Sequence, residues 1–171
     1  MKYIIFLGLL FSFSYANFDN LNSFEADFKQ TITDEKGKSL SYSGHLIASK
    51  PQNAFWKYTK PVIKNIYIDS SKIVIIEPDL EQAIVKRINS NFNLFEIIKN
   101  AQKIDKNRFK ATFEDSNFII KTDKSFIKSL NYKDKFDNNV SIIFSKEKIN
   151  KVYKKDIFIP QIPEDYDIIR E

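Results

Sequence analysis

Apolar and polar residues alternate along most of this chain, as they do in β-strands with one buried face. The alternation predicts strands at 28–32, 40–48, 54–58, 65–69, 72–77, 82–88, 109–113, 118–122, 126–132, 140–144 and 152–159. Short turn sequences separate them, such as D-E-K-G at 34–37 and P-D-L at 78–80. Many short strands at this spacing predict a barrel or a strongly curved sheet.

Two segments have helical spacing instead. Their apolar residues recur every three or four positions: Phe18, Leu21, Phe24 and Phe28 in the first, and Phe92, Phe95 and Ile98 within 92–101 in the second. The first stripe fits ordinary core packing and the inner face of a lid equally well. Because amphipathic helices are rarely left exposed, we expect both to lie across the mouth or concave face of the sheet.

The first sixteen residues have the features of a cleavable secretory signal peptide. Lys2 forms a short positive region, 3–13 is an uncharged apolar run, and Ser14 and Ala16 place small residues before a cut that precedes Asn17. The run is shorter than the ~20 residues that span a bilayer, so an uncleaved anchor is the less favoured reading. We predict an exported protein with a signal peptide at 1–16 and a single domain at 17–171.

The residue types present argue against most catalytic and metal sites. The chain has no Cys and one His, His45, which disfavours Ser-His-Asp and Cys-His triads and zinc sites built on paired His. No P-loop or dinucleotide-binding glycine motif occurs. The formal net charge of +5 is distributed along the chain, which indicates a solvated surface and no nucleic-acid partner. We therefore predict a protein that is not an enzyme and uses no metal or cofactor.

Carboxylates and aromatic residues are the remaining candidates for a site. Glu77, Asp79 and Glu81 resemble a paired-acid or weak calcium site, but a polar turn around Pro78 is the favoured interpretation. The 16 Phe, 8 Tyr and 1 Trp fit a core, an interface or a ligand cavity, and composition alone favours the core.

Three stretches carry a more specific pattern. The first is K-P-Q-N-A-F-W at 50–56, followed by Pro61, Asp69 and P-D-L-E-Q at 78–82. The second is F-E-A-D-F-K-Q at 24–30, and the third is the tail at 158–169. Together they resemble the LolA family of periplasmic outer-membrane lipoprotein carriers. The spacing matches without a gap over 50–82, and the likeness is thin between 100 and 140.

The resemblance implies a mostly β (α+β) fold: an incomplete, strongly curved antiparallel β-barrel with helices forming a lid over the concave face. It also implies a cavity that binds acyl chains. With strand alternation, it points to these inward-facing or lid residues: Leu21, Phe24, Phe28, Leu46, Ala48, Ala54, Trp56, Tyr58, Val74, Ile76, Phe92, Phe95 and Ile98.

Several positions depart from the family pattern. Lys50 stands where the family has an Arg that latches the lid from inside the barrel. Because Lys lacks the planar fork of Arg, the resemblance implies a weaker or different latch here. Val74 and Ile76 replace aromatic residues, Ser70 replaces a Gly, and Asp165 replaces a Gly of the tail. An apolar cavity tolerates the aliphatic replacements.

The resemblance implies a function and a set of partners. Such a carrier is a monomer of the periplasm that binds acylated lipoproteins, receives them from an inner-membrane ABC-type release complex, and delivers them to the outer membrane or an acceptor there. The alternatives are a lipoprotein sensor and a general lipid binder of the same fold. The outer-membrane acceptor itself is disfavoured, because it needs a Cys for its own lipids and this chain has none.

Overall fold

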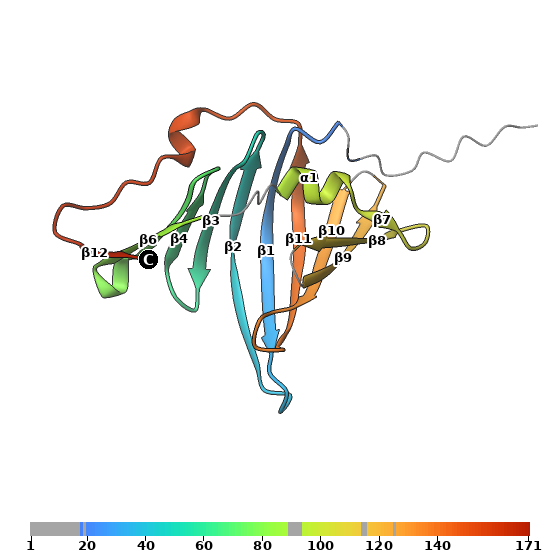
Figure 1. The fold of residues 1–171 in the computed structure, drawn as a ribbon, viewed down its shortest axis with the longest axis horizontal. Helices are drawn as coiled ribbons and strands as arrows, with labels where there is room; N and C mark the ends of the chain where they lie inside the picture. Colours follow the sequence, from blue (N-terminus) through green and yellow to red (C-terminus); the bar gives the residue numbers. More distant parts are fainter. Residues whose placement is uncertain (1–17, 19, 89–93, 114–115, 125) are drawn as a thin grey trace, which may run out of the picture.

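Twelve strands form one open, strongly curved sheet in the computed structural model (Figure 1). The structure describes residues 18, 20–88, 94–113, 116–124 and 126–171, so the predicted signal peptide at 1–16 and Phe92 lie outside the described residues. The strands are β1 (Ser23–Thr33), β2 (Ser39–Ser49), β3 (Asn53–Lys60), β4 (Lys64–Ile68), β5 (Lys72–Glu77), β6 (Gln82–Arg87), β7 (Gln102–Lys103), β8 (Arg108–Phe113), β9 (Ser116–Asp123), β10 (Phe126–Lys133), β11 (Asn139–Ile149) and β12 (Asp167–Arg170).

The sheet is built from two runs of sequential strands that meet at β1. Its order is β12-β6-β5-β4-β3-β2-β1-β11-β10-β9-β8-β7. All neighbours are antiparallel except β12, which pairs with β6 in parallel. Among the described residues the α-helix is the short α1 (Leu94–Lys99), which packs against β8. The prediction of a mostly β, strongly curved antiparallel sheet is confirmed.

Strand β1 replaces most of the helix that was predicted over 18–28. Phe24, Ala26, Phe28 and Gln30 all point to the buried face, whereas Glu25, Asp27 and Lys29 between them are more exposed. Two residues four positions apart share a face in a helix and in a strand alike, so the spacing of Phe24 and Phe28 fits both structures. The strand is the structure that buries both residues in the main core, where Phe24 and Phe28 are 5% and 3% exposed.

A second, smaller core lies on the other face of β5 and β6. Val74, Ile76 and Ala83 are buried there, beneath Ile162 and Tyr166 of the C-terminal segment. This segment contains a 3₁₀ turn at Lys155–Phe158, so the strand predicted at 152–159 is wrong. Both edges of β11 are already paired, with β1 and β10, and the chain that follows β11 rejoins the sheet at the edge strand β6, where it forms β12.

A charged network on the outer face ties the start of the C-terminal segment to β1. The Glu25 carboxylate accepts a hydrogen bond from the Lys148 ammonium at 2.8 Å and another from the Tyr153 hydroxyl. Asp27 bonds His45 at 2.8 Å and Lys146 at 2.8 Å. The hydrogen bonds from Lys148 and Tyr153 lower the pKa of Glu25, and those from Lys146 and His45 lower the pKa of Asp27.

This network predicts a loss of stability in acid. Since folding lowers the pKa of Glu25, its contribution is complete above the ordinary pKa of about 4.5 and is lost as the pH falls through the folded value. We expect Glu25→Gln to reduce the free energy of unfolding at pH 7 by about 1–2 kcal/mol and to flatten its acid dependence below pH ~4.5. Urea unfolding at several pH values measures both effects. Glu164→Gln, at an exposed position, is the control, and equal curves for the two variants would contradict the prediction.

Candidate functional site

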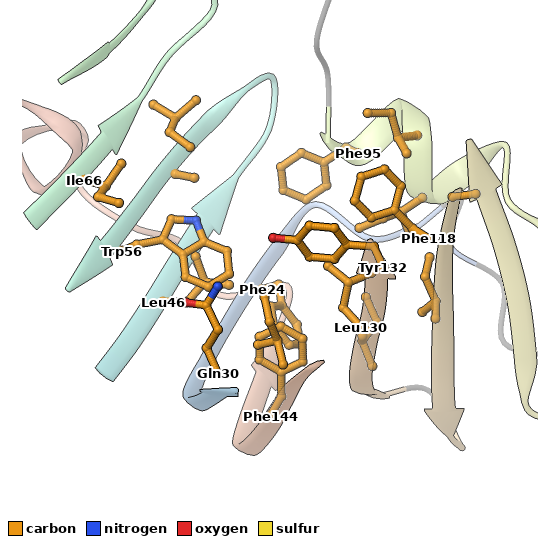
Figure 2. Close-up of a pocket in the computed structure, with 18 of the residues that line it drawn as sticks. Phe24, Gln30, Leu46, Trp56, Ile66, Phe95, Phe118, Leu130, Tyr132 and Phe144 are labelled. Atoms are coloured by element: carbon orange, nitrogen blue, oxygen red, sulfur yellow. The ribbon is translucent and has the colours of Figure 1, made fainter. Parts of the chain in front are cut away.

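The concave face of the sheet encloses an apolar cavity of about 380 Å³. Figure 2 shows Trp56 from β3 on one side, Phe118 and Tyr132 from β9 and β10 on the other, and Phe95 of α1 near the opening between them. Edge-to-face aromatic contacts fix the walls: Phe28 packs against Trp56 and Tyr58 with ring centroids 5.1 and 4.9 Å apart. Phe28 therefore packs against two aromatic residues of the cavity wall from behind.

The side chains of Gln30 and Tyr58, which both line the cavity, form a hydrogen bond with each other. The Tyr58 hydroxyl donates to Gln30 Oε1 at 2.9 Å, and both residues are buried. Burial raises the pKa of Tyr58 to about 12 and also raises the pKa of Tyr132, so both hydroxyls stay neutral at physiological pH. The pair satisfies its own hydrogen bond, and the cavity presents a neutral, largely hydrocarbon surface to any ligand.

Helix α1 closes one side of the cavity and lies next to Lys50. Phe95, Ile97 and Ile98 line the cavity from α1, and Phe95 is only 5% exposed. Lys50 and Pro51, from the turn between β2 and β3, line a neighbouring surface pocket together with Phe95 and Glu96. Lys50 therefore lies beside α1, close enough for its side chain to contact the helix.

The structure brings together part of the predicted set. Seven predicted residues line the cavity: Phe24, Leu46, Ala54, Trp56, Tyr58, Phe95 and Ile98. Leu21, Phe28 and Ala48 are buried in the surrounding core without reaching the cavity surface. Val74 and Ile76 lie on the opposite face of β5, in the second core, because the register pairs Val74 with Tyr67 and Ile76 with Asn65. Their alternation partners Ile73 and Ile75 are the residues on the cavity side.

About half of the cavity wall comes from strands for which no site residue was predicted. They contribute Ile66, Ile68, Ala111, Phe118, Ile120, Ile127, Leu130, Tyr132, Ile142 and Phe144. Their alternation was visible in the sequence, for example Phe118, Ile120 and Thr122 on one face of β9. That signal identifies a buried face but does not distinguish a cavity wall from a solid core.

The carboxylates around Pro78 are accounted for by a hydrogen bond and an exposed turn. Glu77 accepts a hydrogen bond from Gln82 at 2.6 Å, and Asp79 and Glu81 belong to an exposed turn around η1 (Pro78–Leu80). No three His, Asp or Glu side chains of the described residues gather where they could hold a metal ion. Nor is any helix among those residues long and apolar enough to cross a membrane.

Comparisons of the sequence with known proteins match the chain to one family. The model of the family "Outer membrane lipoprotein carrier protein LolA" matches residues 19–107. An outer-membrane lipoprotein carrier protein of Campylobacter jejuni is 40% identical over 168 residues, which cover 98% of this chain and 96% of the relative. One from Helicobacter pylori is 38% identical over 156 residues, covering 89% and 82% of the two chains.

A solved structure has a similar fold at low sequence identity. It is an uncharacterized conserved protein from Thermus thermophilus, with a TM-score of 0.54, 8% identity and coverage of 91% of this chain and 94% of that one. This likeness concerns the fold alone and extends over nearly the whole chain.

Proposed function

Because the chain belongs to the LolA family of outer membrane lipoprotein carriers, we propose that its cavity takes up the acyl chains of a lipoprotein and carries them between membranes. The observation that carries this proposal is the apolar cavity of about 380 Å³, walled by aromatic and aliphatic side chains and bordered by a short helix. A carrier needs to keep water away from the hydrocarbon of its cargo. The cavity wall can do this because no charged side chain of the described residues lines it.

The energetics explain why such a carrier is needed. Each methylene removed from water contributes about 0.8 kcal/mol, so a triacylated protein is held in its membrane by tens of kcal/mol. The carrier replaces lipid with protein surface and so lowers the barrier to leaving the bilayer. It also has to let go at the destination, which favours a cavity whose affinity is limited by competition with its own lid.

Helix α1 is the element we propose for this competition. In the closed form, Phe95 and Ile98 occupy space against the cavity walls, and an entering acyl chain has to displace them. Cargo would then shift the population toward an open form by its differential affinity for that form. The helix has only six residues, so its own stability contributes little resistance to such a movement.

The setting follows from the same proposal. We propose that residues 1–16 direct export, that the mature protein works as a monomer in the periplasm, and that it performs no chemistry on its cargo. An inner-membrane ABC-type complex would supply the lipoprotein, and the outer membrane or an acceptor in it would receive the lipoprotein.

A release assay tests the carrier function. Purified mature protein is added to spheroplasts, or to liposomes that hold the release complex, with a triacylated lipoprotein or its unacylated form. We expect a soluble complex with the acylated form only. No complex with either form, where another carrier of the family succeeds, would refute the proposal.

The position of Lys50 beside α1 leads to a prediction about release. If Lys50 stabilises the closed lid, Lys50→Leu should retain lipoprotein binding but slow its transfer to acceptor membranes by about tenfold, because the closed form no longer competes with cargo. Transfer kinetics from preloaded carrier to liposomes measure this effect. Lys57→Leu, an exposed position on the outer face of β3, is the matched control. A normal transfer rate for Lys50→Leu would end the latch hypothesis.

A further inference from the structure

An apolar strip continues the cavity face of the sheet beyond the cavity itself. Paired residues of neighbouring strands share a face, and the register runs from Trp56 to Ile66, to Ile75, to Ile84 and to Ile169. In the next row Ile68 pairs with Ile73. Trp56, Ile66 and Ile68 line the cavity. The residues beyond them, Ile73, Ile75, Ile84 and Ile169, are named the isoleucine shelf.

The shelf is not needed by either core. Both faces of β5 are apolar, and the outer one is covered, since Val74 and Ile76 are 2% and 3% exposed. Ile73, Ile75 and Ile84 are only partly buried and belong to neither cluster of core residues that the structure describes, and Ile169 is 42% exposed. Helix α1 packs against β8, away from β4, β6 and β12 (Figure 1).

Polar pairs border the shelf at both ends of its strands. On one side Gln82 donates to Glu77 at 2.6 Å, and on the other Lys86 donates to Glu171 at 3.3 Å. These four residues share the face of the shelf, because each is two positions from a shelf isoleucine. Each pair satisfies its own charge or hydrogen bond. A contiguous apolar surface with a polar rim is typical of a binding site, and the band between the rims offers only hydrocarbon contacts.

The size of the cavity indicates what would occupy the shelf. A volume of about 380 Å³ lies near the lower end of the ~300–1,000 Å³ that sites for single small ligands have. One long acyl chain has about the bulk of such a ligand, whereas a triacylated lipoprotein carries three. With α1 in place the cavity therefore accommodates part of the lipid anchor, and the shelf is the apolar surface that adjoins it for the remainder.

From this juxtaposition we infer that the isoleucine shelf is a second acyl-chain subsite, which holds a chain that the cavity does not contain. The inference rests on the proposed carrier function and deepens it. The subsite makes the affinity for a lipoprotein depend on its number of acyl chains. A single chain fits in the cavity, and further chains extend across β5 and β6 toward β12.

Synthetic lipopeptides with one or three palmitoyl chains, presented in detergent micelles, test this inference. The chain has one Trp, Trp56 in the cavity wall, so its fluorescence reports cavity occupation. We expect Ile75→Asn with Ile84→Asn to weaken triacyl binding at least tenfold and monoacyl binding less than twofold. Ile143→Asn, on the outer face at 57% exposure, is the control and should change neither. Equal weakening of both ligands, or of neither, would overturn the subsite.

Photolabelling gives an answer without a variant. A triacyl lipopeptide with a photoreactive group near each chain end is bound to the unaltered protein and irradiated, and labelled peptides are identified by mass spectrometry. We expect label within 72–87 with the triacyl probe and not with the monoacyl probe. Label confined to cavity residues with both probes would overturn the subsite. If the unaltered protein bound neither lipopeptide, the carrier function itself would fail, which is a distinguishable result.

Discussion

Replacing Trp56 with aspartate is expected to abolish lipoprotein capture while leaving a folded protein. Trp56 forms one wall of the cavity, opposite Phe118 and Tyr132 (Figure 2). No Lys or Arg of the described residues lines the cavity, so an acyl chain that enters beside a carboxylate at this position would have to strip water from an unpaired charge. Because Trp56 is only partly buried, the empty carrier can leave that charge in contact with water. We expect capture in the spheroplast assay to fall by more than about tenfold.

The neighbouring residue supplies the control. Phe55 precedes Trp56 on β3 but points to the outer face, where its ring stacks on Tyr67 at 4.7 Å. Phe55→Asp therefore changes an aromatic residue of the same strand without touching the cavity, and it should capture lipoprotein normally. Circular dichroism and thermal unfolding establish that both variants fold. Normal capture by Trp56→Asp would remove this residue from the site, and equal losses in both variants would indicate damage to the strand instead.

Adding one methyl group at Gly44 is expected to destabilise the protein more than a typical substitution does. A Cβ atom at Gly44 would lie 2.0 Å from the carbonyl oxygen of Lys57 and 2.8 Å from the ring of Phe28. The register between β2 and β3 shifts at this point, which brings the two backbones close together. Because the oxygen belongs to the backbone, no rotamer change relieves the clash. We expect Gly44→Ala to reduce the free energy of unfolding by about 3 kcal/mol.

Gly37 provides a matched comparison. It adopts a φ of +78° in the turn between β1 and β2, and a Cβ atom there would meet nothing within 4 Å. Gly37→Ala therefore suffers only the backbone penalty, about 1 kcal/mol. Thermal unfolding of the two variants separates the causes, with a melting temperature reduced by roughly 6–12 °C for Gly44→Ala and by a few degrees for Gly37→Ala. Equal reductions would mean that the clash at Gly44 relaxes.

The hairpins were predictable because their signals are local. The pair 72–77 and 82–88 around P-D-L was expected from alternation and a proline turn, and the structure has β5 and β6 at Lys72–Glu77 and Gln82–Arg87. Phe24 and Phe28 were assigned to a helix, because residues four positions apart share a face in a helix and in a strand alike. Only the pairing of β1 with β11, from the far end of the chain, settles the ambiguity in favour of a strand.

The cavity was predictable where the family pattern or a helical spacing marked it. Trp56 and Tyr58 lie in the matching stretch, and Phe95 and Ile98 lie in the second predicted helix. Phe118, Leu130 and Tyr132 lie where the likeness is thin. Strand β5 shows the physical limit: I-V-I-I is apolar on both faces, and alternation does not say which face turns to the cavity. That choice depends on the C-terminal segment, whose Ile162 and Tyr166 cover Val74 and Ile76.

The place of β1 in the middle of the sheet has a consequence for the order of folding. Strands β2 to β6 and β8 to β11 pair mainly with their neighbours in sequence, so each half can form by short-range steps. Strand β1 joins the halves by pairing with β11 from the far end of the chain, as between Phe28 and Phe144. Until β11 arrives, β1 presents an unpaired edge to other chains. Substitutions that delay β11 are therefore expected to cause aggregation of newly synthesised protein, even where the finished protein would bind its cargo normally.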